Sequence, residues 1–244
     1  MRAVWSVFRR EMAAYFTTPL AYIFITVFLG MAGALTFYMG GFFERDQADL
    51  NAFFTFHPWL YLVLIPAVAM RLWSEDLRSG AIELLLTLPI TTGQAVLGKF
   101  LAAWVFTGLA LALTFPMWLT VAYLGRPDHG VIAAGYLGSF LMAGAYLSIG
   151  AFISALTRNQ VIAFVVTAAV CFLLTVAGSP LVLNVFSAWA GDQATAFIAS
   201  LSFLTHFQDV MKGVVDLRDI VFFVSLTALF LFANWAAIER VKGS

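Results

Sequence analysis

Long, continuous apolar runs recur along this chain and constrain its fold more than any other feature. About 20 consecutive apolar residues are enough for a helix to cross a bilayer, and several runs of this sequence reach that length. Only 11% of the residues are charged, whereas a typical soluble domain has about 25%. The sequence therefore predicts an all-α polytopic membrane protein, with one transmembrane domain over residues 1–244.

Six membrane spans are predicted from these runs. The second span is short unless residues 53–58 extend it. Pro116 is expected to kink the long third span, and Asp216 is placed to cap the start of the sixth. The six spans cover about Leu20–Phe43, Trp59–Leu72, Gln94–Leu124, Val131–Leu156, Val161–Ala177 and Leu217–Ile238.

Residues 1–18 predict an amphipathic helix before the first span. Trp5 and Phe8 belong to an apolar face with helical spacing, while Arg9 and Arg10 fall on another face and Glu11 follows them. Basic residues opposite a Trp/Phe face are typical of a helix that lies in the membrane interface. We therefore assign Arg9, Arg10 and Glu11 to an interfacial helix; a plain cytoplasmic extension of the first span is the alternative.

The distribution of lysine and arginine predicts the orientation in the membrane. Cytoplasmic loops of membrane proteins carry an excess of these residues. With the amino terminus inside, nine of the thirteen Lys and Arg residues are cytoplasmic, and the other four are Arg45, Arg126, Lys212 and Arg218. We expect a multi-pass membrane protein with both termini in the cytoplasm.

The segment Arg71–Ile90 carries a density of charge that cannot lie among lipid tails, so it is predicted at the cytoplasmic face between the second and third spans. Gly80 either interrupts its helix or lets another backbone come close, and Pro89 ends it. An ordinary surface helix is the alternative. One helical face is apolar and consists of Leu77, Ala81, Leu84, Leu85 and Leu88, which Glu75, Arg78, Ser79 and Glu83 largely avoid.

The stretch 178–215 is expected on the outer side and is too apolar for a solvated loop. Gly191 and Asp192 break it near the middle, and each half is too short to cross the membrane. Two short helices that dip into the outer leaflet are predicted.

In the fourth span, small residues such as Gly150 and Ser154 are spaced for close helix packing. We prefer this packing role to the alternative that these residues line a substrate path.

No motif predicts chemistry on this chain. The segment Gly93–Lys99 matches G-x-x-x-x-G-K, but Phe100 stands where a phosphate-binding loop has Ser or Thr for magnesium. His57, His129 and His206 lack metal-ligand spacing, so capping or hydrogen bonding is their expected role. We predict no catalytic, cofactor or metal site, and a net charge of zero gives no signal for nucleic acid.

The charged segment carries a family resemblance. The run Glu75–Ile90, with Leu97–Lys99 after it, resembles the cytoplasmic signature of ABC-2-type ABC transporter permeases, although Ala81 replaces the usual threonine. Within that family the chain is most similar to the gliding-motility-associated (GldF-like) branch. The resemblance to the branch rests on Phe16–Tyr22, Phe54, Pro58, Trp59, His206 and Lys212–Asp216.

The resemblance implies a specific assembly. It implies six membrane helices, a coupling helix within residues 71–90, and short outer-side helices before the last span. Two permease copies, as a homodimer, would work with two ATP-binding subunits, so ATP and magnesium would bind the partner and this chain would hold no cofactor. The residues expected to contact the ATPase subunit are Glu75, Asp76, Leu77, Gly80, Glu83, Leu84 and Leu85.

The expected function is therefore the permease subunit of an ATP-driven ABC transporter, an exporter, embedded in membrane lipid. The predicted spans have no ionisable residue at their centres, so the energy is expected to come from a separate ATPase. The alternative is a non-transporting membrane module that transmits ATP-driven force or a signal to an extracytoplasmic accessory protein.

Overall fold

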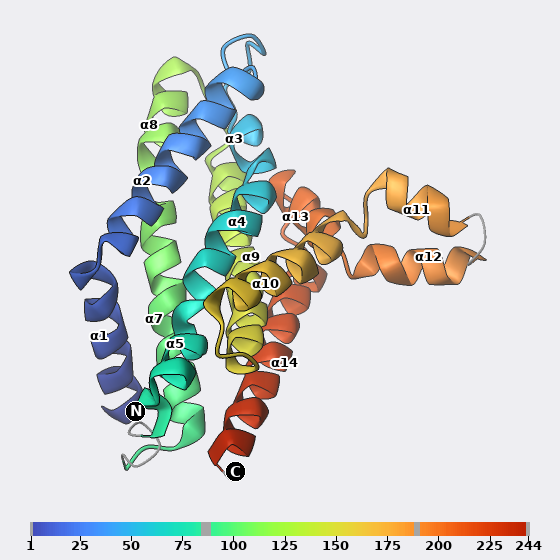
Figure 1. Ribbon diagram of the computed structural model, residues 1–244. Helices are drawn as coiled ribbons and strands as arrows, with labels where there is room; N and C mark the ends of the chain where they lie inside the picture. The colour runs from blue at the N-terminus through green and yellow to red at the C-terminus, as the bar shows by residue number, and fades with distance from the viewer. Residues whose placement is uncertain (1, 84–88, 188–190, 243–244) are drawn as a thin grey trace.

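The computed structural model describes residues 2–83, 89–187 and 191–242, and all regular elements in those ranges are helical (Figure 1). The all-α class predicted from the sequence is thus confirmed. The helices of the first half are α1 (Arg2–Thr17), α2 (Pro19–Ala34), the π-helix η1 (Leu35–Met39), α3 (Asn51–Thr55), α4 (His57–Ala69), α5 (Arg71–Ser79), α7 (Thr92–Ala112) and α8 (Phe115–Leu124). Those of the second half are α9 (His129–Ala155), α10 (Gln160–Val176), α11 (Pro180–Ser187), α12 (Gly191–Ser200), α13 (Phe203–Met211) and α14 (Leu217–Lys242).

The number of long apolar helices differs from the six expected spans. Within the described residues, four helical stretches are long and apolar enough to cross a membrane, and the bent pair α10 and α11, at 73° to each other, would make a fifth. The four stretches are Ala21–Met39, Thr92–Leu124, His129–Ala155 and Leu217–Lys242. The third expected span breaks between α7 and α8 just before Pro116, which agrees with the kink expected there.

The expected second span, Trp59–Leu72, is not formed as a single long helix. Its apolar part, α4, has only 13 residues. A break at Phe56 separates α4 from α3, and a break at Met70 separates it from α5. The apolar sequence ends at Met70 and the charged sequence begins at Arg71, so α4 and α5 are two helices of different character.

Helix α9 is the centre of the bundle, and α4, α5, α7, α10, α13 and α14 all pack against it. Its glycines make this possible: a Cβ on Gly150 would lie only 2.4 Å from the Ala69 Cβ, and one on Gly138 would lie 2.7 Å from Val210 Cγ1. The same kind of approach brings Trp104 onto Gly144 and Phe54 onto Gly135. The small residues of this span therefore serve helix packing, as predicted.

Both termini lie at the same end of the bundle, as Figure 1 shows, and the turn between η1 and α3 lies at the other end. Among its described residues, the region 178–215 has three short helices where two were expected, and they are α11, α12 and α13. Helix α12 begins at Gly191, the position at which the sequence predicted a break. The Ser202 hydroxyl caps α13 by accepting from Thr205 N at 3.5 Å, and Phe203 and Phe207 are fully buried. Helices α11 and α12 project sideways from the bundle (Figure 1).

Candidate functional site

The candidate site is the short charged helix α5, at the end of the bundle that carries both termini (Figure 1). Its inward face is apolar, since Leu72 and Trp73 are almost completely buried. Its C-terminus is defined by Gly80, whose φ of 75° and ψ of 2° are left-handed. Glycine adopts that conformation at little cost and commonly ends helices in this way. The interruption expected at Gly80 is therefore present.

The start of α5 is held by one hydroxyl group from the central helix. Ser154 Oγ accepts hydrogen bonds from Trp73 N at 3.1 Å and Ser74 N at 3.0 Å, and donates to Met70 O at 2.9 Å. The first four amides of a helix have no partner within the helix, and Ser154 supplies one for Trp73 while it also contacts the next amide, that of Ser74. This hydroxyl thereby uses its donor and both of its acceptor positions. The junction of α4 and α5 is fixed to α9.

A buried lysine joins α5 to two further helices. Lys99 of α7 has only 4% of its side chain exposed, and its Nζ lies 2.9 Å from Asp76 Oδ2 and 3.2 Å from Glu11 Oε1 of α1. The same ammonium group lies 5.1 Å from the centre of the Trp73 ring, within the range of a cation–π contact. One cation thus forms ion pairs with a carboxylate of α1 and a carboxylate of α5, and Arg10 is a second partner of Glu11.

The residue before this lysine allows α1 to come close. A Cβ on Gly98 would lie 2.7 Å from the Val7 Cβ and 3.1 Å from Val4 O, so a larger residue at 98 would push α1 away. The pair Gly98-Lys99 therefore has two complementary roles, close contact and charge neutralisation. These contacts explain why glycine and lysine stand side by side at the end of the G-x-x-x-x-G-K pattern, which the sequence had already excluded as a phosphate-binding loop.

The ion pair makes a contribution to stability that depends on pH. Burial opposes ionisation of the Glu11 carboxyl, yet the Lys99 ammonium and the Arg10 guanidinium hold the pKa of Glu11 below its ordinary value. Stabilisation from a depressed carboxyl pKa is complete above the ordinary value and is lost as the pH falls through the folded-state value. We expect the unfolding midpoint in detergent to fall more between pH 5 and pH 3, about the ordinary range of glutamate, in the unmodified chain than in Glu11→Gln. Equal pH dependence in the two proteins would contradict this.

The outward edge of α5 is polar and accessible. Glu75 pairs with Arg71 through two contacts, Arg71 Nε to Glu75 Oε2 at 2.9 Å and Arg71 NH2 to Glu75 Oε1 at 3.3 Å, and 43% of the Glu75 side chain is exposed. Arg78 and Ser79 are exposed, and so is Glu83, which lies four residues beyond the end of α5. This edge offers charges of both signs to whatever lies beyond the end of the bundle.

The other residues predicted for partner contact have different positions. Asp76 is paired with Lys99, and Leu77 is half-buried against the bundle's own core, so both hold α5 in place. No described atom lies within 4 Å of a Cβ placed on Gly80, outside its nearest neighbours in the chain. Leu84 and Leu85 lie outside the described residues. On α1, Arg9 and Arg10 are exposed and Glu11 turns inward to Lys99.

Sequence reasoning placed Lys99 and Ser154 near this end of the bundle but assigned neither a role in holding α5. The sequence did carry one signal for the role of Lys99. It is a lone lysine in an otherwise apolar helix, and a charge in such a position normally has a partner of opposite charge. Nothing local identified that partner as Asp76 or Glu11. Ser154 was recognised only as a small packing residue.

The three histidines are occupied in hydrogen bonds. His57 Nδ1 lies 2.7 Å from Ser139 Oγ, and His129 Nδ1 accepts from Trp118 Nε1 at 3.0 Å. His206 lies between Asp219 and the Ser200 carbonyl. Across the described part of the chain, no three His, Cys, Asp or Glu residues are grouped so that they could hold a metal ion. The expected hydrogen-bonding role of the histidines agrees with these contacts.

Comparison with known proteins adds a family. The family model described as "ABC-2 family transporter protein" matches residues 17–238, nearly the whole chain. The match includes α5, Lys99 and Ser154, and it leaves out most of α1.

Individual relatives match in part. Heme exporter protein B of Rhodobacter capsulatus is 32% identical over 102 residues, which are 38% of this chain and 45% of that protein. The Probable multidrug ABC transporter permease YbhS of Escherichia coli is 27% identical over 183 residues, 73% of this chain and 47% of that protein. Heme exporter protein B of Paracoccus denitrificans is 36% identical over 87 residues, 36% of this chain and 38% of that protein. The chain spans less than half the length of each of these relatives.

Proposed function

Because the chain belongs to the ABC-2 family of transporter proteins, we propose that it is the permease subunit of an ATP-driven exporter and that α5 is the docking site for a separate ATP-hydrolysing subunit. The relatives named as permeases and exporters support a role in transport. Within the family we propose the gliding-motility-associated branch, on the sequence resemblance alone.

The observation that carries this proposal is the two-sided construction of α5. Its inner side is attached to α9 through Ser154 and to α7 and α1 through Lys99. Its outer side presents Glu75 and Arg78, and Glu83 is exposed in the segment that follows Gly80. A helix that served only to close a turn between spans would not need attachment to three other helices. A helix that receives force from a partner does need it, because a loose helix would move without moving the bundle.

We propose the following coupling. Closure of the partner around ATP displaces α5, and the Ser154 hydrogen bonds pass this displacement to α9. Since α9 also packs against α13 and α14, movement at one end of the bundle reaches the other. The Asp76–Lys99–Glu11 contacts move α7 and α1 together with α5. The partner contacts would come from Glu75 and Glu83, with Gly80 allowing close approach and Leu84 and Leu85 adding apolar surface.

The remaining assembly follows from the family. We propose a homodimer of this chain with two ATP-binding subunits, which hold ATP and magnesium, in a bacterial inner membrane with both termini cytoplasmic. The helices α3 and α4 would provide a short second crossing, which gives six in all. The helix α1 would lie in the cytoplasmic interface with Arg9 and Arg10 toward the lipid headgroups.

Charge reversal on the outer edge of α5 tests the docking site. We expect Glu75→Lys combined with Glu83→Lys to reduce the amount of cognate ATP-binding subunit that co-purifies by at least tenfold, because like charges facing each other across an interface repel. Stimulation of ATP hydrolysis by the membrane subunit should be lost with it. Co-purification and ATPase measurements on the complex in lipid nanodiscs check both.

The matched control is Glu44→Lys, which reverses an exposed carboxylate in the turn between η1 and α3 at the opposite end of the bundle. Assembly with the Glu44 variant should be normal. If the Glu75 and Glu83 double variant also assembles and stimulates ATP hydrolysis normally, α5 is not the docking site.

A second candidate function is the transmission of ATP-driven force to an extracytoplasmic protein. It is favoured by the α11–α12 hairpin, which projects from the bundle (Figure 1) and exposes 80% of Leu181 and 66% of Phe197. The two functions predict different effects of added compounds on the rate of ATP hydrolysis by the complex. A transporter complex should respond to at least one of a set of test compounds, which are heme and drugs, after the names of its relatives, together with lipids, polysaccharide precursors and copper. A stable complex that responds to none of them would favour force transmission.

A further inference from the structure

The buried pair of His206 and Asp219 joins three helices away from the docking end of the bundle (Figure 1). His206 Nδ1 lies 2.6 Å from Asp219 Oδ1, in the first turn of α14. His206 Nε2 lies 3.0 Å from the carbonyl oxygen of Ser200, the last residue of α12. Both His206 and Asp219 are only 4% exposed. One side chain of α13 thus holds the end of α12 to the start of α14.

These two contacts together require two protons. A backbone carbonyl only accepts hydrogen bonds, so His206 Nε2 must carry a hydrogen. The contact between Nδ1 and Asp219 Oδ1 needs a second hydrogen, whichever of the two atoms holds it. A neutral histidine beside an ionised aspartate brings only one. In that state one of the two contacts is lost, and it is the one to Ser200, because a hydrogen bond to a carboxylate is the stronger of the two.

The helix ends at this pair favour its charged form. The N-terminus of a helix stabilises a negative charge and the C-terminus a positive one. Asp219 lies at the N-terminus of α14, and the His206 ring lies at the C-terminus of α12. The Ser200 carbonyl is among the last four of its helix, which have no partner within the helix. An imidazolium between these two ends therefore satisfies both.

The Ser200 contact lies at the base of the projecting pair α11 and α12. Helix α11 packs against α12, and α12 packs against α13. The start of α11 is held separately, since Ser202 Oγ donates to Thr175 O at 3.0 Å and a Cβ on Gly178 would lie 2.8 Å from the Ser202 Cβ. Loss of the Ser200 contact would therefore free the end of α12 while the start of α11 stays in place.

The cavity beside this pair has a volume of about 400 Å³ and is also lined by charged residues, which are Asp209, Lys212, Asp216 and Arg218. Lys212 Nζ pairs with Asp209 Oδ1 at 2.9 Å, and Asp216 Oδ1 accepts from Arg218 N. Aspartate, lysine and arginine ordinarily keep their charge between about pH 5 and 8, whereas histidine changes its charge in this range. The cavity gives water, and with it protons, a way to His206.

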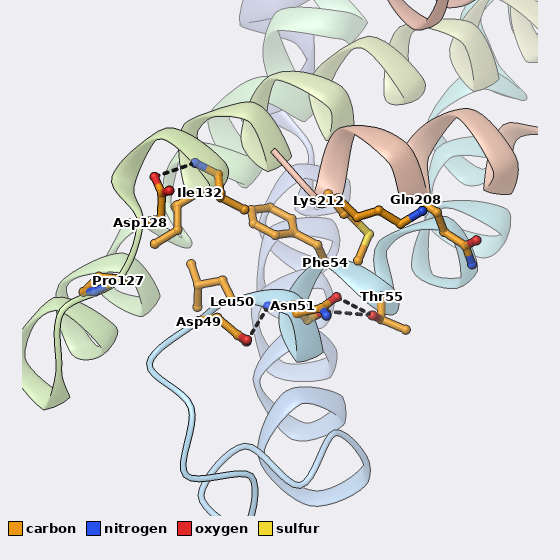
Figure 2. A pocket seen from close by; sticks show the side chains of 12 residues that line it. Asp49, Leu50, Asn51, Phe54, Thr55, Pro127, Asp128, Ile132, Gln208 and Lys212 are labelled. Carbon is orange, nitrogen blue, oxygen red and sulfur yellow. Dashed lines mark hydrogen bonds between the residues drawn. The ribbon is translucent and has the colours of Figure 1, made fainter. Parts of the chain in front are cut away.

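The other helices that pack against α13 are α3, α9 and α10. Helices α9 and α10 contribute the titratable groups Tyr146 and Cys171, both buried. Asp49 and Asp128, which precede α3 and α9, line a separate cavity with Lys212, and each is turned to its own backbone amides (Figure 2). Among the described residues, the ion pair of His206 is the one with Asp219.

We propose that His206 and Asp219 form a proton-dependent latch, which holds the end of α12 against the bundle when protonated and releases it when one proton is lost. The closed latch binds one proton more than the open one. Closure is therefore favoured below the range in which histidine ordinarily loses its charge, about pH 5–8, and is lost as the pH rises through it. The latch does not depend on the docking proposed for α5.

The release of α12 is measured as a distance between two spin labels by pulsed electron–electron double resonance. The labels are attached to Phe197→Cys on α12 and Tyr123→Cys at the end of α8, both exposed positions, while the buried Cys171 stays unlabelled. The chain is placed in lipid nanodiscs and diluted with unlabelled chain. We expect the ratio of closed to open latch to fall at least about tenfold from pH 5 to pH 8, the factor by which a hydrogen bond to a charged group shifts an equilibrium.

Asp219→Asn distinguishes the latch from an ion pair that only stabilises the fold. The asparagine amide can donate to Nδ1 of a neutral histidine, whose Nε2 hydrogen still reaches Ser200. This variant should therefore stay closed at both pH values, whereas loss of a purely structural ion pair would open it at both. His206→Gln removes the titrating ring and should abolish the response to pH. The matched control is His129→Gln, an exposed histidine at the start of α9, which should respond like the unmodified chain.

Three results would overturn the proposal. They are equal distances at the two pH values with His206 and Asp219 unchanged, a response to pH that persists in His206→Gln, and an Asp219→Asn variant that is open at both pH values. The first comparison leaves the pair intact, so it decides the question even if a variant of the pair fails to fold.

Discussion

Lys99→Met is expected to lower the unfolding midpoint by roughly 6–12 °C. The substitution removes the cation that Asp76 and Glu11 share, so Asp76 loses its ion pair and Glu11 keeps only its pair with the exposed Arg10. Removing one partner of a buried ion pair costs about 3–5 kcal/mol. We expect about 3 kcal/mol, the lower end of that range, because 16% of the Glu11 and 22% of the Asp76 side chain remain exposed. For a domain of this size, 1 kcal/mol shifts the midpoint by about 2–4 °C.

The midpoint can be followed with a thiol-reactive fluorophore. Cys171 is the chain's single cysteine and is completely buried, so it reacts only when the bundle opens. The control is Lys212→Met, which removes an exposed lysine whose ion pair with Asp209 leaves 69% and 52% of the two side chains accessible. Exposed pairs contribute at most about 1 kcal/mol, so this variant should stay near the unmodified protein.

A rescue separates charge from packing in the Lys99 result. Adding Glu11→Gln and Asp76→Asn to Lys99→Met removes all three charges together and should recover most of the lost stability. If Lys99→Met is as stable as Lys212→Met, or if the neutral triple variant is no better than Lys99→Met alone, the ion pair does not hold α1 and α5 to α7.

Gly150→Leu is expected to destabilise the bundle by about 3 kcal/mol, the upper end of ordinary overpacking costs. The first atom of the new side chain would already lie 2.4 Å from the Ala69 Cβ and 3.0 Å from Thr167 Cγ2. Both neighbours are on helices, so α4 or α10 must move away from α9. Movement of α4 would also separate Met70 from Ser154, so we expect ATPase coupling to fall together with the midpoint.

The control for Gly150→Leu is Gly33→Leu in α2, where no other atom lies within 4 Å of the added Cβ. Glycine within a helix costs about 0.5–1 kcal/mol relative to alanine, so the control should be neutral or slightly stabilising. A second comparison removes the clash directly. Gly150→Ala should be less harmful when Ala69→Gly is present, and failure of this compensation would mean that the contact between α9 and α4 is not the cause.

Elements with long local patterns were predictable from the sequence. The fourth expected span, Val131–Leu156, corresponds to α9 at His129–Ala155 within two residues, because Asp128 caps its start. The sixth expected span begins at Leu217 as predicted, where Asp216 Oδ1 accepts from Arg218 N. Caps and apolar length are local properties, and for these helices they are sufficient.

Elements that depend on distant partners were not predictable in the same way. The break between α4 and α5 involves a hydroxyl about 80 residues further along the chain. The role of Lys99 requires α1, α5 and α7 to meet, which no local pattern specifies. The charged character of α5 was evident from sequence alone. Its division into an anchored inner side and an accessible outer edge required the structure.

The Ser154 contacts also have a consequence for the order in which the protein matures. The α5 amides of Trp73 and Ser74 are synthesised about 80 residues before the hydroxyl that they contact. A nascent chain that ends before α9 therefore has α5 without its anchor. Only when α9 has entered the bundle does α5 acquire its final position. If α5 is the docking helix proposed above, a partner that recognises its final position would select chains whose central helix is already in place.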